Sequence, residues 1–365
     1  MARPDPTAEP EASEPEALVL TNWFDPGQDG ESYSATVRLT GRRVGIQGRG
    51  SERDSFVHEE AIDGIVPGSG PVSISSWIYG LEPGEWVVTV DPVRRNGQAD
   101  RRGRHWPNRR DASPLRPAAW SWRRWAVSNA PAGHAKTRWA LPAPLARIPA
   151  VIPGSWLLLG ALAVVVALMT QATILGHESI SAGPALAVSA LALALGLVGA
   201  KIWYAILHRR SLRQAVRGGW AVDGFFVVAL PVAAMTLLAT NMPVGTILDA
   251  TAPGLFLGVA IGRIGCFFSG CCAGRCTRSH WGIWSSDRRI GARRVPAQLI
   301  ESLAGLAIAI TTWLLIHARL PGVDGIGFVA AVGAYMLVRQ VVLRLRAERR
   351  DYSWRRSTTI SRQGA

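Results

Sequence analysis

Lysine is nearly absent from this chain of 365 residues, which contains only Lys136 and Lys201. Arginine therefore supplies almost all of the positive charge, and the formal net charge at pH 7 is +14. Cysteine is also scarce, and all four cysteines lie between Cys266 and Cys276. Residues 1–17 are acidic and Pro-rich and lack the apolar core of a secretory signal peptide, so we expect a disordered tail there.

Long apolar runs are missing from the first 150 residues, which are polar and rich in Arg, Pro and Gly. Apolar residues dominate from residue 151 onward, and an apolar helix of about 20 residues crosses a bilayer core of about 30 Å. We expect an α-helical integral membrane bundle in the cell membrane. The six predicted spans are 153–174, 184–207, 219–240, 246–268, 296–317 and 322–343.

Residues 18–93 have the pattern of β-strands. The segments "SATVRLTG" and "RVGIQG" are short, β-branched and bounded by glycine. The segment "YGLEPGEWVVTV" resembles the last strands of fibronectin-type or immunoglobulin-like sandwiches. We therefore expect a small N-terminal β-sandwich domain, acting as a spacer or a partner-docking module without chemistry of its own.

Residues 94–150 form a predicted linker with an excess of basic residues. It has thirteen Arg or Lys residues against Asp100 and Asp111, and its tryptophans interleave with arginines in "WSWRRW". Such a segment could bind nucleic acid, but beside a membrane span the attraction of anionic lipid heads is the more economical interpretation. We expect no nucleic-acid partner. A position on the membrane surface and a solvated linker both remain open.

Charged residues inside the predicted spans indicate a functional site, because charge at membrane depth is costly. Asp223 lies in the third predicted span, where a structural ion pair is an equally open interpretation. Arg263 lies near the end of the fourth, between Gly262 and Gly265. These glycines would let a lipid head approach closely and leave backbone amides open to an anion.

Two further polar pairs lie in the last two spans. Gln298 and Glu301 are three residues apart, so one helical face carries both. Tyr335 and Arg339 are four residues apart and share a face in the same way. A carboxylate and an amide just inside a bilayer need partners.

The segment "GRIGCFFSGCCAGRCT" followed by "VPAQLIES" resembles the prolipoprotein diacylglyceryl transferase family. That family has a Gly-Arg-x-Gly-Asn-Phe-x-Asn-Gly-Glu-x-x-Gly signature and a His-Pro-x-Gln-Leu-Tyr-Glu box. "GGWAVDGFF" and "YMLVRQVV" are similar to two further elements of the family. The resemblance covers roughly residues 154–346, within a predicted membrane domain at 151–346, and a basic tail follows at 347–365.

The resemblance implies an enzyme that moves the diacylglyceryl group of phosphatidylglycerol onto a cysteine thiol of a lipoprotein precursor. Glycerol phosphate leaves, so the site needs cationic groups for the phosphate and a base for the thiol. The expected partners are phosphatidylglycerol or another anionic phospholipid, the lipoprotein precursor and the membrane, with no cofactor. The implied catalytic residues are Asp223, Arg263 and Arg339, and the implied substrate-binding residues are Gly262, Gly265, Gly270, Gly274, Gln298 and Glu301.

The chain departs from the family pattern at several polar positions. Asp223 stands at the family's histidine, Cys266 at its asparagine and Cys271 at its glutamate. The cysteines Cys266, Cys271, Cys272 and Cys276 have three interpretations. They could bind a soft metal or cluster, exchange disulfides with thiol pKa values lowered by nearby arginines, or fill close-packed positions. The alternative function is a non-catalytic, thiol-redox or metal-binding membrane relative with a partner-binding N-terminal domain.

The distribution of arginine predicts the membrane topology. The basic segments are the linker, residues 208–217, residues 275–294 and the tail, whereas the other connections carry one arginine between them. Counting these charges places both termini and residues 269–295 in the cytoplasm. The family resemblance implies instead that the signature loop lies outside. The two predictions differ, and both remain open at this stage.

Overall fold

The computed structural model describes residues 16–46, 50–93, 134–136, 138–139, 148–208, 220–318 and 324–347. Residues 1–15 and 348–365 of the predicted tails and most of the linker lie outside these ranges, whereas residues 16 and 17 of the predicted N-terminal tail belong to a strand. The chain divides into two compact units. Unit 1 comprises residues 1–156, 266–298 and 342–365, and unit 2 comprises residues 157–265 and 299–341.

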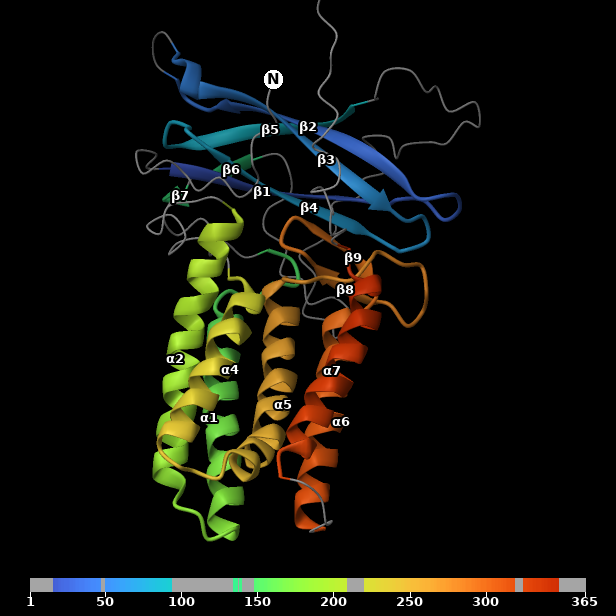
Figure 1. Cartoon of the computed structure of the whole chain (residues 1–365). Helices are drawn as coiled ribbons and strands as arrows, with labels where there is room; N and C mark the ends of the chain where they lie inside the picture. Colours follow the sequence, from blue (N-terminus) through green and yellow to red (C-terminus); the bar gives the residue numbers. More distant parts are fainter. Residues whose placement is uncertain are drawn as a thin grey trace, which may run out of the picture. The chain divides into compact units, whose positions relative to one another are not determined.

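Unit 1 contains all the strands. The N-terminal region supplies β1 (Glu16–Phe24), β2 (Tyr33–Arg43), β3 (Ser55–Ile65), β4 (Val72–Tyr79) and β5 (Glu85–Val93), with a short 3-10 helix at Glu52–Asp54 between β2 and β3. Two short strands follow, β6 (His134–Lys136) and β7 (Arg138–Trp139). The β-strand pattern predicted for the N-terminal region is thus confirmed at the level of strands arranged in sheets (Figure 1).

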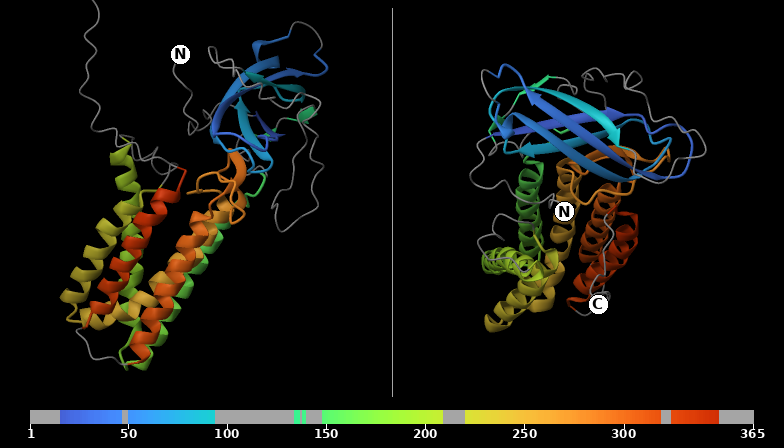
Figure 2. Two further views of the ribbon diagram at one scale, coloured as in Figure 1. Left: turned by 90° about the vertical axis from the view of Figure 1, so that its right-hand side faces the viewer. Right: turned by 90° about the horizontal axis from the view of Figure 1, so that it is seen from above.

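The first sheet draws on two distant parts of the sequence. Its order is β7-β1-β4-β9-β8, where β8 (Ile283–Ser286) and β9 (Ile290–Arg294) form a hairpin that follows the signature segment. β4 pairs antiparallel with β9, with Ser73 opposite Gly291 and Ile74 opposite Ile290. The second sheet has the order β3-β2-β5-β6. Figure 2 shows the hairpin, in orange, beside the blue N-terminal strands.

One hydrophobic core joins the two sheets. Leu18, Leu20, Ile74 and Ile78 of the first sheet and Val37, Leu39, Ile62, Trp86 and Val88 of the second belong to a single buried cluster. The cluster also includes Ala292 of β9. Alternation explains this arrangement, since every second side chain of a strand points to the same face. The hairpin therefore contributes to the core as well as to the hydrogen bonds of the sheet.

Side chains reinforce the junction between the hairpin and the N-terminal strands. Trp284 stacks on Trp23 with ring centroids 5.3 Å apart, and its indole N–H donates to the carbonyl of Pro71 at 2.9 Å. Arg289 forms an ion pair with Glu60 of β3. Burial lowers the pKa of the Arg289 guanidinium. Sequence patterns gave no sign of this junction, because its partners are more than 200 residues apart.

The helical bundle comprises α1 (Ser155–His177), α2 (Ala182–Leu207), α4 (Val222–Ala239), α5 (Val244–Ser269), α6 (Ala297–His317) and α7 (Ile326–Leu345). Five of these helices are long and apolar enough to cross a membrane, and α4 is a shorter apolar helix over residues 224–239. The helices contain the cores of all six predicted spans. The prediction of a helical membrane bundle is confirmed.

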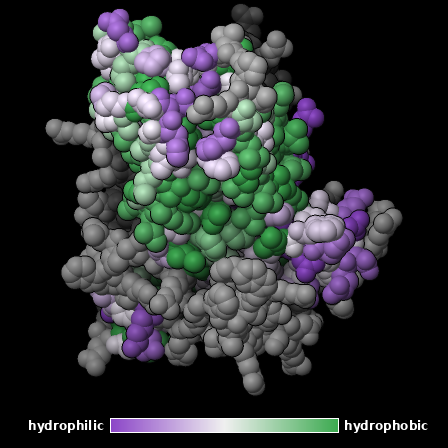
Figure 3. All heavy atoms as spheres, turned by 90° about the horizontal axis from the view of Figure 1, so that it is seen from below, coloured by the Kyte–Doolittle hydropathy of each residue, from purple (hydrophilic) through white to green (hydrophobic). Residues whose placement is uncertain are grey.

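The outward faces of the helices carry large apolar side chains. Leu158, Leu303 and Leu337 have exposed fractions of 72%, 66% and 72%. Figure 3 shows apolar residues, in green, gathered over one face of the molecule. Because water would disfavour a contiguous surface of this kind, lipid tails are its natural solvent.

Small residues allow α2 and α4 to pack closely. A Cβ added at Gly199 of α2 would lie 2.7 Å from the carbonyl oxygen of Gly224, and also against Val228 of α4. Membrane helices use such small residues because lipid tails give no hydrophobic reward for helix association, which depends on close packing.

We predict that Gly199→Leu destabilises the bundle by about 1–3 kcal/mol, the usual cost of overpacking. Thermal unfolding of the purified chain in detergent measures the effect. Gly160→Leu in α1 is the matched control, because a Cβ at Gly160 has nothing within 4 Å. Equal unfolding temperatures for the two variants would contradict the close packing of α2 and α4.

Candidate functional site

Three polar side chains of unit 2 meet around the carboxylate of a fourth, Glu301. Arg263 of α5 approaches Glu301 Oε1 with Nη2 at 2.8 Å, and Arg339 of α7 with Nη1 at 3.0 Å. The hydroxyl of Tyr335, also on α7, donates to the same oxygen at 2.7 Å. We call Arg263, Glu301, Tyr335 and Arg339 the arginine cluster.

The arginine cluster carries an excess of positive charge. Glu301 is fully buried, at 0% exposure, and its single negative charge faces two guanidinium groups. Arg263 and Arg339 keep side-chain exposures of 14% and 16%. With both arginines and the glutamate ionised, the cluster has a net charge of +1. An anion that reaches the exposed edges of the guanidinium groups would balance this charge.

Helical spacing explains how three helices supply the cluster. Tyr335 and Arg339 are one turn apart on α7, and Glu301 lies in the first turns of α6. The Tyr335 ring packs on Phe256 of α5 with centroids 5.5 Å apart. Ser302 Oγ donates to the carbonyl of Ala260 at 2.7 Å and so ties α6 to α5. The sequence pointed to Tyr335 only through its spacing from Arg339.

The C-terminal end of α5 is a tight backbone turn in unit 1. Gly270 has φ of +72°, and a Cβ there would lie 2.9 Å from the carbonyl oxygen of Ser286. Gly274 allows a closer approach, because a Cβ would collide with the carbonyl of Val295. Both signature glycines are therefore needed for backbone geometry. Gly262 and Gly265 lie on α5, and Gly262 has open space where a Cβ would be.

Gln298, in the first turn of α6, contacts the signature loop, which we define as residues 270–296. Its side chain is buried, and Nε2 donates to the carbonyl of Cys271 at 2.9 Å. The contacts of Gln298 and Glu301 thus differ, although the two residues are only three positions apart. Glu301 contacts the arginines, whereas Gln298 holds the backbone of the loop.

Two arginines that the sequence analysis did not single out also hold the signature loop. Arg294 is buried, donates to the carbonyl of Gly274 at 3.0 Å and forms an ion pair with Asp287 at 2.7 Å. Arg288 donates to the carbonyl of Ser269 at 2.8 Å. In the sequence, the dense run of arginines before "VPAQ" could have indicated that this segment has a structural role. These contacts show that at least two of the arginines satisfy backbone carbonyls.

None of the four cysteines, all of which the structure describes, forms a disulfide. The pKa of the Cys271 thiol is raised, chiefly by its contact with the Cys266 thiol, and burial raises the pKa of Cys276. The expected lowering by neighbouring arginines is therefore wrong for these two thiols. Among the described residues, no group of three or more His, Cys, Asp and Glu side chains is arranged to hold a metal ion.

Three further charged residues of the helices, Asp223, Asp249 and Lys201, lie outside the arginine cluster. Asp223 lies in α4, but its side chain is outside the part of the chain that the structure describes. Asp249 accepts the backbone N–H groups of Gly325 and Phe328 at 2.7 and 2.8 Å, and so caps α7. Lys201 lies over the ring of Trp220, 4.2 Å from its centroid.

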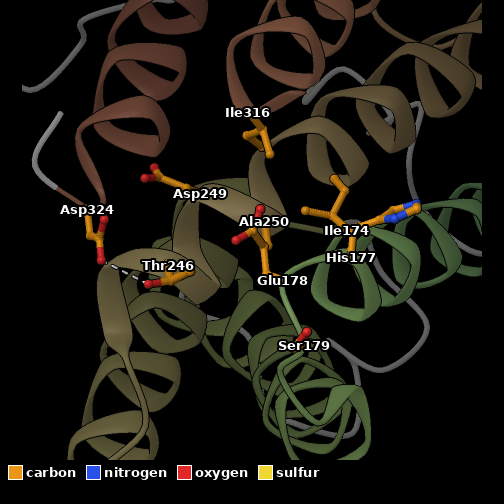
Figure 4. Close-up of a pocket in the computed structure, with 9 residues that line it drawn as sticks. All are labelled: Ile174, His177, Glu178, Ser179, Thr246, Asp249, Ala250, Ile316 and Asp324. Carbon is orange, nitrogen blue, oxygen red and sulfur yellow. Dashed lines mark hydrogen bonds between the residues drawn. The ribbon is translucent and has the colours of Figure 1, made fainter. Parts of the chain in front are cut away.

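Unit 2 also has a cavity of about 470 Å³ near the N-terminal end of α5 (Figure 4). Its lining includes Asp249, Asp324 and Glu178, so its charge disfavours an anionic lipid head. Thr246 donates to Asp324 at 3.0 Å on one wall. Along α5, Asp249 and Arg263 are separated by about 21 Å at a rise of 1.5 Å per residue. The arginine cluster is therefore the better candidate for binding a phosphate.

Comparisons with known proteins identify the family of this chain. The family model of prolipoprotein diacylglyceryl transferase matches residues 154–362. A phosphatidylglycerol–prolipoprotein diacylglyceryl transferase of Solidesulfovibrio magneticus is 36% identical over 106 residues, which is 28% of this chain and 40% of that protein. The Clostridium tetani enzyme of the same name is 25% identical over 164 residues, covering 42% and 65% of the two chains.

A third relative is phosphatidylglycerol–prolipoprotein diacylglyceryl transferase 2 of Clostridium perfringens. It is 29% identical over 125 residues, or 32% of this chain and 49% of that protein. The chain thus spans between 40% and 65% of the length of these relatives. The family model covers more than half of the chain and includes every residue of the arginine cluster. The chain therefore belongs to the prolipoprotein diacylglyceryl transferase family.

Proposed function

We propose that the protein is a membrane transferase that moves the diacylglyceryl group of phosphatidylglycerol to a cysteine thiol of a lipoprotein precursor. The observation that carries this proposal is the arginine cluster, where two arginines share one buried carboxylate and keep part of their side chains exposed. The curated relatives are named for this activity, and the family model covers the helices that form the cluster.

The arginine cluster would act on the phosphate of the donor lipid. In the reaction, the sulfur of the acceptor attacks a glycerol carbon, a C–S bond forms, and the bond from that carbon to the phosphate oxygen breaks. The electron pair of that bond leaves with glycerol phosphate. Arg263 and Arg339 would stabilise the negative charge that grows on the departing phosphate, and Glu301 would hold them in position.

The acceptor thiol must lose a proton during the attack. We propose Asp223 as the base, since it stands where the family motif has histidine. A carboxylate with an ordinary pKa near 3.9 is a weak base for a thiol, so this role requires burial that raises the pKa. We further propose that Gly262 and Gly265 give the lipid head access to α5, while Gln298, Gly270 and Gly274 set the backbone of the signature loop.

We also propose that α4 is a sixth span. β4 precedes α1 in the sequence, β9 follows α5, and the two strands pair within one sheet. Both strands must therefore lie on the same side of the membrane, which requires an even number of crossings between them. With α1, α2 and α5 as spans, α4 supplies the fourth crossing.

The N-terminal strands support a sandwich of the immunoglobulin or fibronectin type. The two sheets share one core. In the second sheet, β2 pairs with β3 and also with β5, which follows β4 of the first sheet in the chain. We propose that this domain is a docking module with no chemistry of its own. Its pairing with β9 keeps it attached to the signature loop.

Substitution of either cluster arginine should reduce transfer severely. We predict that Arg263→Ala and Arg339→Ala each lower the rate by about 10²–10³, the usual effect of removing a group that stabilises developing negative charge. The measurement is transfer of radiolabelled diacylglycerol from phosphatidylglycerol vesicles to a peptide with a lipobox cysteine.

Arg344→Ala is the matched control, because Arg344 is an exposed arginine at the end of the same helix, α7. A peptide with serine in place of the cysteine shows that the thiol accepts the label. Absence of transfer by folded protein, or equal rates for Arg263→Ala and Arg344→Ala, would refute the proposed function.

Labelling single cysteines from each side of the membrane tests the number of spans. In a chain with its four cysteines replaced by alanine, we predict that Val57→Cys and Ser279→Cys react with an impermeant maleimide from the same side. Thr240→Cys, in the connection after α4, should react from the opposite side. All three residues are exposed. Reaction of Thr240→Cys from the same side as Val57→Cys would exclude α4 as a span.

A further inference from the structure

The proposed transferase reaction uses none of the four cysteines of this chain. Three of them, Cys266, Cys271 and Cys272, nevertheless come together where α5 ends. Cys276 is separate, since it forms a β-bridge with Arg294 and has a thiol shielded by burial. The arrangement of the first three therefore needs its own explanation.

The backbone at the end of α5 determines which two thiols meet. The N–H of Cys271 donates to the carbonyl of Cys266 at 3.1 Å, and the N–H of Gly270 donates to the carbonyl of Phe267 at 3.3 Å. Gly270 has the left-handed conformation, with φ of +72°. These features define the Schellman motif, in which the side chains of the first and sixth residues commonly touch. Here those residues are Cys266 and Cys271.

The side chains have the contact that the motif predicts. The Cys271 thiol donates to the carbonyl of Cys266 at 3.6 Å and lies 3.2 Å from the hydroxyl of Ser269. The Cys266 thiol is also the largest influence on the pKa of the Cys271 thiol, which it raises. Cys266 is 9% exposed, whereas Cys271 is only partly buried and can meet a dissolved reagent.

We propose that Cys266 and Cys271 form a reversible dithiol–disulfide pair that closes the C-terminal cap of α5. A disulfide requires a Cα separation of about 4.4–6.8 Å. The adjacent residues Cys271 and Cys272 fall below this range, because consecutive Cα atoms are about 3.8 Å apart across a trans peptide bond. Cys266 and Cys271, at the two ends of the turn, are instead joined by a backbone hydrogen bond of 3.1 Å.

The oxidant is a low-molecular-weight disulfide, and glutathione disulfide is the probe. The Cys271 thiol gives its proton to water, and its sulfur attacks one sulfur of the probe. The probe's S–S bond breaks, one glutathione leaves, and a mixed disulfide remains. The deprotonated sulfur of Cys266 then attacks the Cys271 sulfur and releases the second glutathione. The two cysteines lose two electrons, and the probe gains them.

Mass spectrometry of the full-length chain in detergent tests the proposal. The chain is incubated with glutathione disulfide, remaining thiols are blocked with iodoacetamide, and trypsin is added. Cleavage after Arg263 and Arg275 releases residues 264–275 with three of the cysteines, and Cys276 begins the next peptide. We expect one alkylated cysteine and one internal disulfide on the peptide of residues 264–275 after oxidation, and three alkylated cysteines after reduction.

The variants separate the possible pairs. Cys266→Ser and Cys271→Ser should abolish the internal disulfide, while Cys276→Ser, the control, should keep it. Three alkylated cysteines on the oxidised wild-type peptide would overturn the proposal. An internal disulfide that persists in Cys266→Ser would overturn it too, because that disulfide must join Cys271 and Cys272. Because the experiment measures the mass of the peptide of residues 264–275, its result is independent of transferase activity.

Discussion

The membrane domain and its candidate site depend on the ion pairs that the buried carboxylate of Glu301 forms with two arginines. A charge at membrane depth is costly unless it is paired, and two guanidinium groups and a tyrosine hydroxyl converge on one oxygen of this carboxylate. The same contacts link α5, α6 and α7. Among these four side chains one negative charge faces two positive ones, and we propose an anionic ligand for the same site.

The second organising feature is the sheet that β4 shares with β9. It makes the hairpin of the signature loop part of the N-terminal core, through Ala292 and through the stacking of Trp284 on Trp23. The N-terminal strands and the signature loop thus belong to one folded unit. This arrangement constrains topology, since the strands on either side of the first helices must meet on one side of the membrane.

The sequence was most informative where a structural feature depends on residues that are close together in the chain. Apolar runs predicted the helices, and helical spacing predicted that Tyr335 and Arg339 share a face. The convergence of Arg263 and Arg339 on Glu301 could not be derived from spacing, because it joins three helices; only the family resemblance linked these residues. Pairing of β4 with β9 was not predicted, since short strands carry little information about distant partners. The role of Asp223 stays a prediction.

We propose that the arginine cluster binds the phosphate of an anionic phospholipid. Native mass spectrometry of the purified chain, given equal amounts of phosphatidylglycerol and phosphatidylcholine, tests it directly. The wild-type chain should retain phosphatidylglycerol in preference, and a variant combining Arg263→Gln and Arg339→Gln should lose that preference. If the folded double variant retained phosphatidylglycerol as well as the wild type does, the phosphate would bind elsewhere and the claim would be wrong.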